Sequence, residues 1–242
     1  MTPRHVVDTL FAGLLLLAGA PLAAQGDDSL QLTFDLGYVN TAGNTDLTTL
    51  NFGEHLSFAT GSWVLGQYVT VVEGRSNGEE TAAQYKTAGR VDRVLSPRFG
   101  AYGLGGFERN VFAGIAQRYE EGAGLTAKAV DQPHDLLSFE GGISFIQQRS
   151  VTRIRETFGA GRAAAQYKHG FGDATYFQQG VELLANLQNS ADRRVNTETI
   201  LVAPISKRIA LKAAYAIRFD NQPEPGFKKS DRVFTTGIQI TF

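Results

Sequence analysis

The chain has 242 residues, no cysteine and a formal net charge of −1. The lack of cysteine excludes disulfides, thiolate chemistry and cysteine metal sites, and the near-neutral charge gives no basic footprint for nucleic acid. Glycine makes up 27 of the 242 residues, above the roughly 7% of an average protein, and many of these glycines lie inside alternating runs, where they permit the bending that closed sheets require.

The N-terminal segment has the pattern of a secretory signal peptide. Arg4 and His5 precede an apolar run at residues 10–20, and small residues follow up to Ala24. This pattern predicts cleavage near residues 24–26. The run is shorter than the roughly 20 apolar residues of a membrane-spanning helix, so an N-terminal membrane anchor is the weaker interpretation.

The rest of the sequence has no long apolar run, so a membrane protein of this sequence would have to cross the bilayer as a closed barrel. From residue 30 onward, apolar and polar residues alternate in runs of about 10–14, separated by clusters of turn residues, as in transmembrane barrels. We expect a signal peptide at 1–25 and a barrel at 26–242. The predicted strands are 30–40, 47–59, 63–73, 81–95, 99–110, 117–130, 137–148, 153–168, 176–188, 194–205, 209–220 and 231–242.

The last predicted strand, 231–242, alternates most regularly. Phe234, Ile238, Ile240 and Phe242 share one face, and mostly polar residues share the other. Its backbone needs a pairing partner, and the first strand is the natural one, because closure removes the sheet edge. The terminal Phe242 also resembles the signal that directs bacterial outer-membrane barrels into the membrane. The alternative interpretation is an edge strand of a soluble sandwich.

The connections predict two different ends of the barrel. Those after the even-numbered strands are short, whereas those after the odd-numbered strands tend to be longer and more polar, as expected of periplasmic turns and surface loops. Glu54 interrupts the apolar face of the second strand, which predicts a β-bulge nearby.

The segment 36–49, LGYVNTAGNTDLTT, resembles the opening of the domain of unknown function 481 family, described as salt-induced outer-membrane proteins. Its most specific part is Gly43, Asn44 and Thr45, followed by a threonine-rich strand. The resemblance implies an outer-membrane barrel and supplies no reaction and no catalytic residue. Gly43 and Asn44 also suit a turn that needs positive φ, so this motif either is structural or binds a ligand or partner.

Some outer-membrane barrels are lipid hydrolases, which makes the histidines the residues to examine. His134 and His169 lie in predicted periplasmic turns, and only His55 lies within a predicted strand, where it faces the lumen. The sequence has no nucleophile elbow, no metal-binding histidine spacing and no phosphate-binding loop. We therefore expect no catalytic, cofactor-binding or metal-binding residues and no cofactor.

Charged residues on the polar faces of the strands form the most informative pattern. A charge that faces hydrocarbon near the midplane costs roughly 2–4 kcal/mol, so we expect these side chains to face the lumen. They either neutralise one another in a packed interior, which we favour, or line a narrow polar channel, because a twelve-stranded barrel is intermediate in size. The predicted lumen-lining charges are Asp35, Arg90, Asp92, Arg118, Glu120, Lys128, Glu140, Glu156, Arg162, Glu182, Glu198, Lys212 and Arg218.

The sequence therefore predicts an all-β, transmembrane, antiparallel up-and-down barrel of about 12 strands in the outer membrane of a Gram-negative bacterium. We expect a non-enzymatic envelope protein related to salt or osmotic stress, with a largely occluded lumen. The main alternative is a narrow pore for ions or small polar solutes, followed by a binding protein that uses the surface loop at 221–230 and by a lipid hydrolase. The expected partners are outer-membrane lipid and, during insertion, the barrel assembly machinery, with the chain as a monomer.

Overall fold

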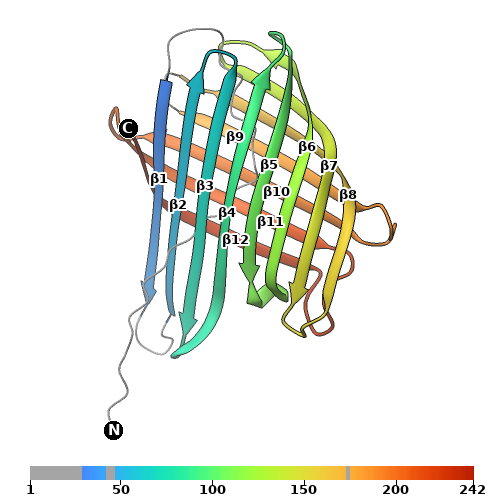
Figure 1. Ribbon diagram of the computed structural model, residues 1–242. Coiled ribbons are helices and arrows are strands. Elements are labelled where there is room, and N and C mark those ends of the chain that lie inside the picture. The colour runs from blue at the N-terminus through green and yellow to red at the C-terminus, as the bar shows by residue number, and fades with distance from the viewer. Residues whose placement is uncertain (1–28, 42–46, 173–174) are drawn as a thin grey trace.

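The computed structural model describes residues 29–41, 47–172 and 175–242. Strands β1 to β12 form one closed antiparallel barrel, in which each strand pairs with its neighbours in sequence and β12 returns to β1. Strands β1 to β8 form the front of the barrel in Figure 1, and β9 to β12 cross behind them. The strands are β1 Ser29–Thr41, β2 Leu47–Thr60, β3 Trp63–Ser76, β4 Glu79–Val94, β5 Phe99–Asn110, β6 Ile115–Asp131, β7 Asp135–Ser150, β8 Arg155–Gly170, β9 Tyr176–Asn186, β10 Arg193–Pro204, β11 Ile209–Asp220 and β12 Ser230–Thr241.

The predicted barrel and its twelve strands are confirmed, and most strand ends agree within two residues. A short 3₁₀ helix, η1 (Val111–Ala113), joins β5 to β6. In the described part of the chain, no helix is long and apolar enough to cross a membrane. The predicted signal peptide lies outside the described residues, as does the first-hairpin motif Gly43, Asn44 and Thr45.

The predicted polar loop between the third and fourth strands is wrong. Arg75 and Ser76 continue β3 and pair with Glu80 and Glu79, with a register shift beside Gly74. Only two residues, Asn77 and Gly78, make the turn, with φ values of 51° and 81°. Two consecutive residues of positive φ are typical of the tight turn that matches strand twist. The predicted difference in loop length between the two ends of the barrel therefore fails at this connection.

The β-bulge predicted near Glu54 is also wrong. The pairings of β2 with β1 and β3 run through Glu54 without a register shift, and it lies opposite Phe34 and Val69. The alternation is kept because the carboxyl group simply takes its place on the outer face, where Glu54 Oε2 has no hydrogen-bond partner among the described residues. Glu121 on β6 is a second acid on this face, opposite Gly105 and Phe145.

The seam between β1 and β12 closes the barrel, as predicted. Thr33–Leu36 pair with Thr241–Ile238, and the backbones of Leu32 and Phe242 exchange two hydrogen bonds. Each strand has a glycine next to the paired stretch, Gly37 on β1 and Gly237 on β12. A Cβ on Gly37 would lie 2.7 Å from the carbonyl oxygen of Thr236, and a Cβ on Gly237 would collide with the carbonyl oxygen of Leu36. The close approach of the two backbones therefore requires glycine at both positions.

The two faces of the wall differ as a membrane barrel requires. The outer face exposes large apolar side chains, including Leu125 at 62% and Ile143 at 67%. Inside the barrel, polar side chains alternate with small apolar clusters that the sequence did not lead us to expect. One cluster joins Ile146, Phe158, Ala160 and Leu184, and another joins Tyr68, Ala88, Tyr102 and Leu104.

Candidate functional site

A central group of ion pairs occupies the lumen. Glu140 on β7 accepts hydrogen bonds from two arginines: Arg90 Nη2 lies 2.7 Å from Oε1, and Arg162 Nη1 lies 2.6 Å from Oε2. Each arginine also holds a second acid, with Arg90 Nε 2.8 Å from Asp92 Oδ2 and Arg162 Nε 2.8 Å from Glu182 Oε2. We call these five residues the central belt. It joins β4, β7, β8 and β9, strands that include non-neighbours in the barrel.

Tyr102 on β5 supports the central belt. Its hydroxyl accepts a hydrogen bond of 2.9 Å from Arg162, and the guanidinium of Arg90 lies 4.2 Å from the ring centroid. Gly124 and Gly142 make room for it, because a Cβ at either position would come within 2.7 Å of the Tyr102 hydroxyl. These two lumen-facing glycines therefore allow the aromatic ring to lie beneath the arginines.

A second group of charges joins opposite walls of the barrel. Arg218 on β11 donates from Nη1 to Glu108 Oε1 on β5, at 2.6 Å. These strands lie six positions apart in the closed ring of twelve, so the pair spans the lumen. Glu108 Oε2 also accepts from Arg118 on β6 at 3.2 Å, and Arg118 donates twice to Gln148 Oε1 on β7. We call Glu108, Arg118, Arg218 and Gln148 the cross-lumen bridge.

The loop between β11 and β12, residues 221–229, folds over the same end of the barrel. Asn221 Nδ2 donates to the Ala191 carbonyl at 2.9 Å, and Gln222 Oε1 accepts from Asn189 at 2.7 Å. Glu224 Oε2 accepts from Thr152 at 2.9 Å. The loop is thus held by the β7–β8 and β9–β10 connections, and we refer to it as the β11–β12 loop.

A third group of charges lies beside the seam. Lys212 on β11 donates to Asp35 Oδ2 on β1, and Gln239 on β12 donates to Asp35 Oδ1 at 3.2 Å. The group therefore connects the two strands that close the barrel to β11. Glu198 on β10 is 3% exposed and belongs to the same inner surface.

The remaining predicted charges lie on the inner side of β6 and β8. Glu120 accepts from Ser144 at 2.8 Å, and Lys128 pairs with Asp131 at 2.7 Å. Glu156 lies opposite the buried Gln148 at the rim, is exposed, and makes no ion pair with a described residue. The structure thus gathers the predicted residues into separate groups instead of one continuous column.

Several lumen residues were not among the predicted set. Glu108 was missed because β5 is rich in glycine, which hides its alternation. Arg194 was missed although it lies two and four residues before Asn196 and Glu198 on β10, so the same alternation that placed Glu198 inward would have found it. The lumen-facing Tyr102 carried no charge signal at all.

The histidines do not form a hydrolytic site among the described residues. His55 stacks on Tyr68 with ring centroids 4.5 Å apart, and its Nε2 has no hydrogen-bond partner. His169, which the sequence placed in a turn, belongs to β8 instead, and its Nδ1 lies 2.8 Å from Asp135 Oδ1. In residues 29–41, 47–172 and 175–242, no cluster of three or more histidines and acids has a geometry that could hold a metal ion.

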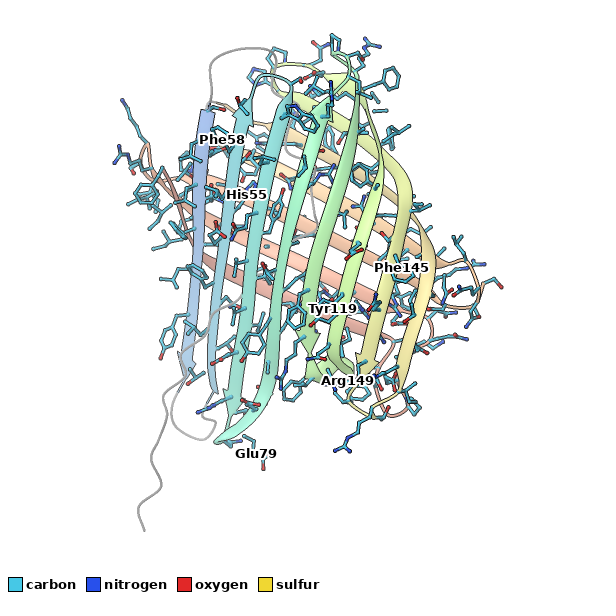
Figure 2. The ribbon with its side chains drawn as sticks, in the orientation of Figure 1. His55, Phe58, Glu79, Tyr119, Phe145 and Arg149 are labelled. Carbon is cyan, nitrogen blue, oxygen red and sulfur yellow. The ribbon has the colours of Figure 1, made fainter. Side chains whose placement is uncertain are left out.

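Phe242 follows β12 and is 63% exposed on the outer face. Its ring meets that of Phe34 edge-on, with centroids 6.2 Å apart. Figure 2 shows Phe58 near the upper end of the barrel and Tyr119 below its middle.

The model of the family described as "Protein of unknown function, DUF481" matches residues 34–242. The chain belongs to this family. It is 24% identical over 245 residues to "Uncharacterized protein YdiY" of Escherichia coli (strain K12), covering 93% of this chain and 95% of that protein.

The chain is similar to solved structures of barrel proteins. The NanC porin has a TM-score of 0.53 at 12% sequence identity, covering 88% of this chain and 99% of that one. The translocator domain of the autotransporter NalP from Neisseria meningitidis has a TM-score of 0.48 at 15% identity, covering 91% of each chain. The first likeness shows an outer-membrane barrel fold and transfers no solute or activity.

Proposed function

We propose that this chain is a non-enzymatic envelope protein, exported by its signal peptide, whose lumen is held shut in the resting state. The observation that carries the proposal is the Arg218–Glu108 pair, because it joins opposite walls of the barrel at 2.6 Å. The β11–β12 loop covers the same end. A solute would have to break both to pass.

The central belt supports closure at a second level. The side chains of Arg90, Arg162 and Glu140 are only 0%, 1% and 6% exposed. Removing one partner of a buried ion pair leaves the other charge unpaired at a cost of about 3–5 kcal/mol. Thermal motion alone therefore opens such a group rarely, which favours an occluded barrel over a permanently open channel.

Planar-bilayer recording tests this proposal. Refolded wild-type protein, its folded state confirmed by heat-modifiable gel mobility, is expected to give no reproducible conductance steps. The double variant Arg218→Ala/Glu108→Ala removes the wall-to-wall pair and leaves the central belt, so any conductance it gains over the wild type measures the share of the closure that the pair provides. Arg149→Ala is the matched control. Arg149 lies near the end of β7, at the end of the barrel where Glu79 begins β4 (Figure 2), and it belongs to none of the lumen groups. Steady conductance by the wild type would refute closure.

A narrow pore for ions or small polar solutes is the second candidate. It is supported by a cavity of about 80 Å³ beneath the β11–β12 loop, lined by Arg118, Glu182 and Asp220 among others. If the wild type conducts, Arg162→Glu should change the ion selectivity of the current. An unchanged reversal potential in that variant would remove the central belt from the permeation path.

The cellular part of the proposal is a role in salt or osmotic stress, with the protein acting as a monomer in outer-membrane lipid after insertion by the barrel assembly machinery. The family resemblance of the first hairpin motivates it. A deletion strain is expected to grow more slowly than its parent at high salt and to recover when the gene is restored. Equal growth across salt and detergent challenge would count against an envelope role.

A further inference from the structure

A cavity lined mostly by polar and charged side chains lies beneath the β11–β12 loop. It has a volume of about 80 Å³ and is bounded by β4 to β7 on one side and β9 to β12 on the other. Since a cavity needs roughly 10–15 Å³ of such space to hold one water, this cavity suits a small ion together with a few waters.

Basic side chains slightly outnumber acidic ones around this cavity. Six lysines and arginines line it against five carboxylates. Several carboxylates are already engaged: Glu108 pairs with two arginines, Glu182 pairs with Arg162, and Glu120 accepts from Ser144. The basic residues are Lys86, Arg118, Arg194, Arg218, Lys228 and Lys229.

Arg194 is the residue that points to a ligand. It is 7% exposed, and its Nε and Nη1 make no hydrogen bond with any described residue. The nearest acids, Asp192 at 3.5 Å and Asp220 at 3.3 Å from Nε, attract its charge without accepting a well-directed hydrogen bond. Buried polar groups are nearly always hydrogen-bonded, so a buried guanidinium with unused donors calls for an acceptor within this cavity.

Lys86 supplies a second donor to the same cavity. Its ammonium makes no hydrogen bond or ion pair with a described residue, although its charge acts on Glu108 and Glu182. Lys228 and Lys229 belong to the β11–β12 loop and line the cavity from the loop side. A negative ligand here would therefore contact the wall and the loop together.

We propose that this cavity binds a small oxyanion, such as phosphate or a short carboxylate, through Arg194 and Lys86, and that the bound anion holds the β11–β12 loop closed. The planar guanidinium and the ammonium are the side chains suited to oxygen-bearing anions. This site goes beyond the proposed function, since it binds its ligand whether or not the lumen conducts.

Calorimetry on the folded protein in detergent tests the site directly. Sodium phosphate and sodium acetate are titrated separately against a chloride background at constant ionic strength. Saturable binding of phosphate, acetate or both by the wild type is expected, with at least a tenfold weaker affinity in Arg194→Gln. Arg149→Gln removes the same kind of charge at the same end of the barrel but outside the cavity, and it should bind like the wild type.

Limited trypsin digestion gives a second measurement on the unmodified chain. Because Lys228 and Lys229 are in the loop that the anion would hold, cleavage there should slow when the anion is added at constant ionic strength. This arm keeps the test decisive even if Arg194→Gln does not fold. The absence of saturable binding by the folded wild type, or equal affinity in a folded Arg194→Gln, would overturn the proposal, as would unaltered cleavage at these lysines.

Discussion

Replacing Glu140 with glutamine tests how much the central belt stabilises the barrel. The Glu140 carboxylate receives hydrogen bonds from Arg90 at 2.7 and 3.1 Å and from Arg162 at 2.6 Å. Loss of one partner from a buried ion pair costs about 3–5 kcal/mol. Each arginine keeps another carboxylate, on Asp92 and Glu182, so we expect a loss near the lower limit, about 3 kcal/mol.

Urea unfolding in detergent or lipid vesicles measures this loss. The chain has one tryptophan, Trp63, which is 42% exposed at the start of β3 and reports the transition. With a denaturant slope of about 2 kcal/mol per molar, Glu140→Gln should lower the urea midpoint by about 1.5 M. Glu156→Gln is the matched control, since Glu156 makes no ion pair with a described residue, and its midpoint should stay at the wild-type value.

The double variant Glu140→Gln/Arg162→Gln tests the reasoning further. If Glu140 and Arg162 act within one buried group, the double variant should lose less stability than the sum of the two single variants, with a coupling energy of roughly 0.5–3 kcal/mol. Equal midpoints for Glu140→Gln and the wild type, or strictly additive losses in the double variant, would refute the view that these residues act as one buried group.

Three further substitutions test other parts of the wall. Gly237→Ala should reduce the fraction that folds, seen by gel mobility, because its Cβ would strike the β1 backbone, whereas Gly105→Ala should not, because nothing lies within 4 Å of a Cβ there. Glu54→Leu should stabilise the barrel by up to about 2 kcal/mol, since it removes a carboxyl from the outer face, and so raise the urea midpoint by up to about 1 M; a lower midpoint would contradict this. Lys212→Met should lower stability by about 2 kcal/mol, because it leaves the partly buried Asp35 without its cation, and an unchanged midpoint would show that the pair contributes nothing.

The barrel could be predicted from the sequence because strand alternation is a local property. In β11, Ile209, Leu211 and Tyr215 alternate with Lys212 and Arg218. Neither this period of two nor the assignment of the polar residues to one face depends on distant residues. The same reasoning placed the predicted charges on the inner side. It failed for the β3–β4 turn, where two residues suffice because Asn77 and Gly78 both accept positive φ.

The partners of the inner charges could not be predicted in this way. Which side chains meet across a lumen depends on the tilt and stagger of the closed sheet, quantities that no single strand encodes. The pairing of Arg218 with Glu108 is an example, since 110 positions separate them in the chain.

The two levels of closure differ in a way that separates binding from conduction. The β11–β12 loop is held by exposed hydrogen bonds such as those of Asn221 and Gln222, which contribute little because water competes for them. The central belt is held by buried ion pairs that are costly to break. Opening the loop should therefore be frequent and opening the belt rare. A small anion could then exchange with the cavity around Arg194 from the loop side while the belt blocks passage to the other end. Under this arrangement Arg194→Gln should weaken anion binding without making a non-conducting barrel conduct. Arg218→Ala/Glu108→Ala removes the cross-lumen pair but leaves the central belt. The conductance of this variant therefore reports how much of the closure each level provides.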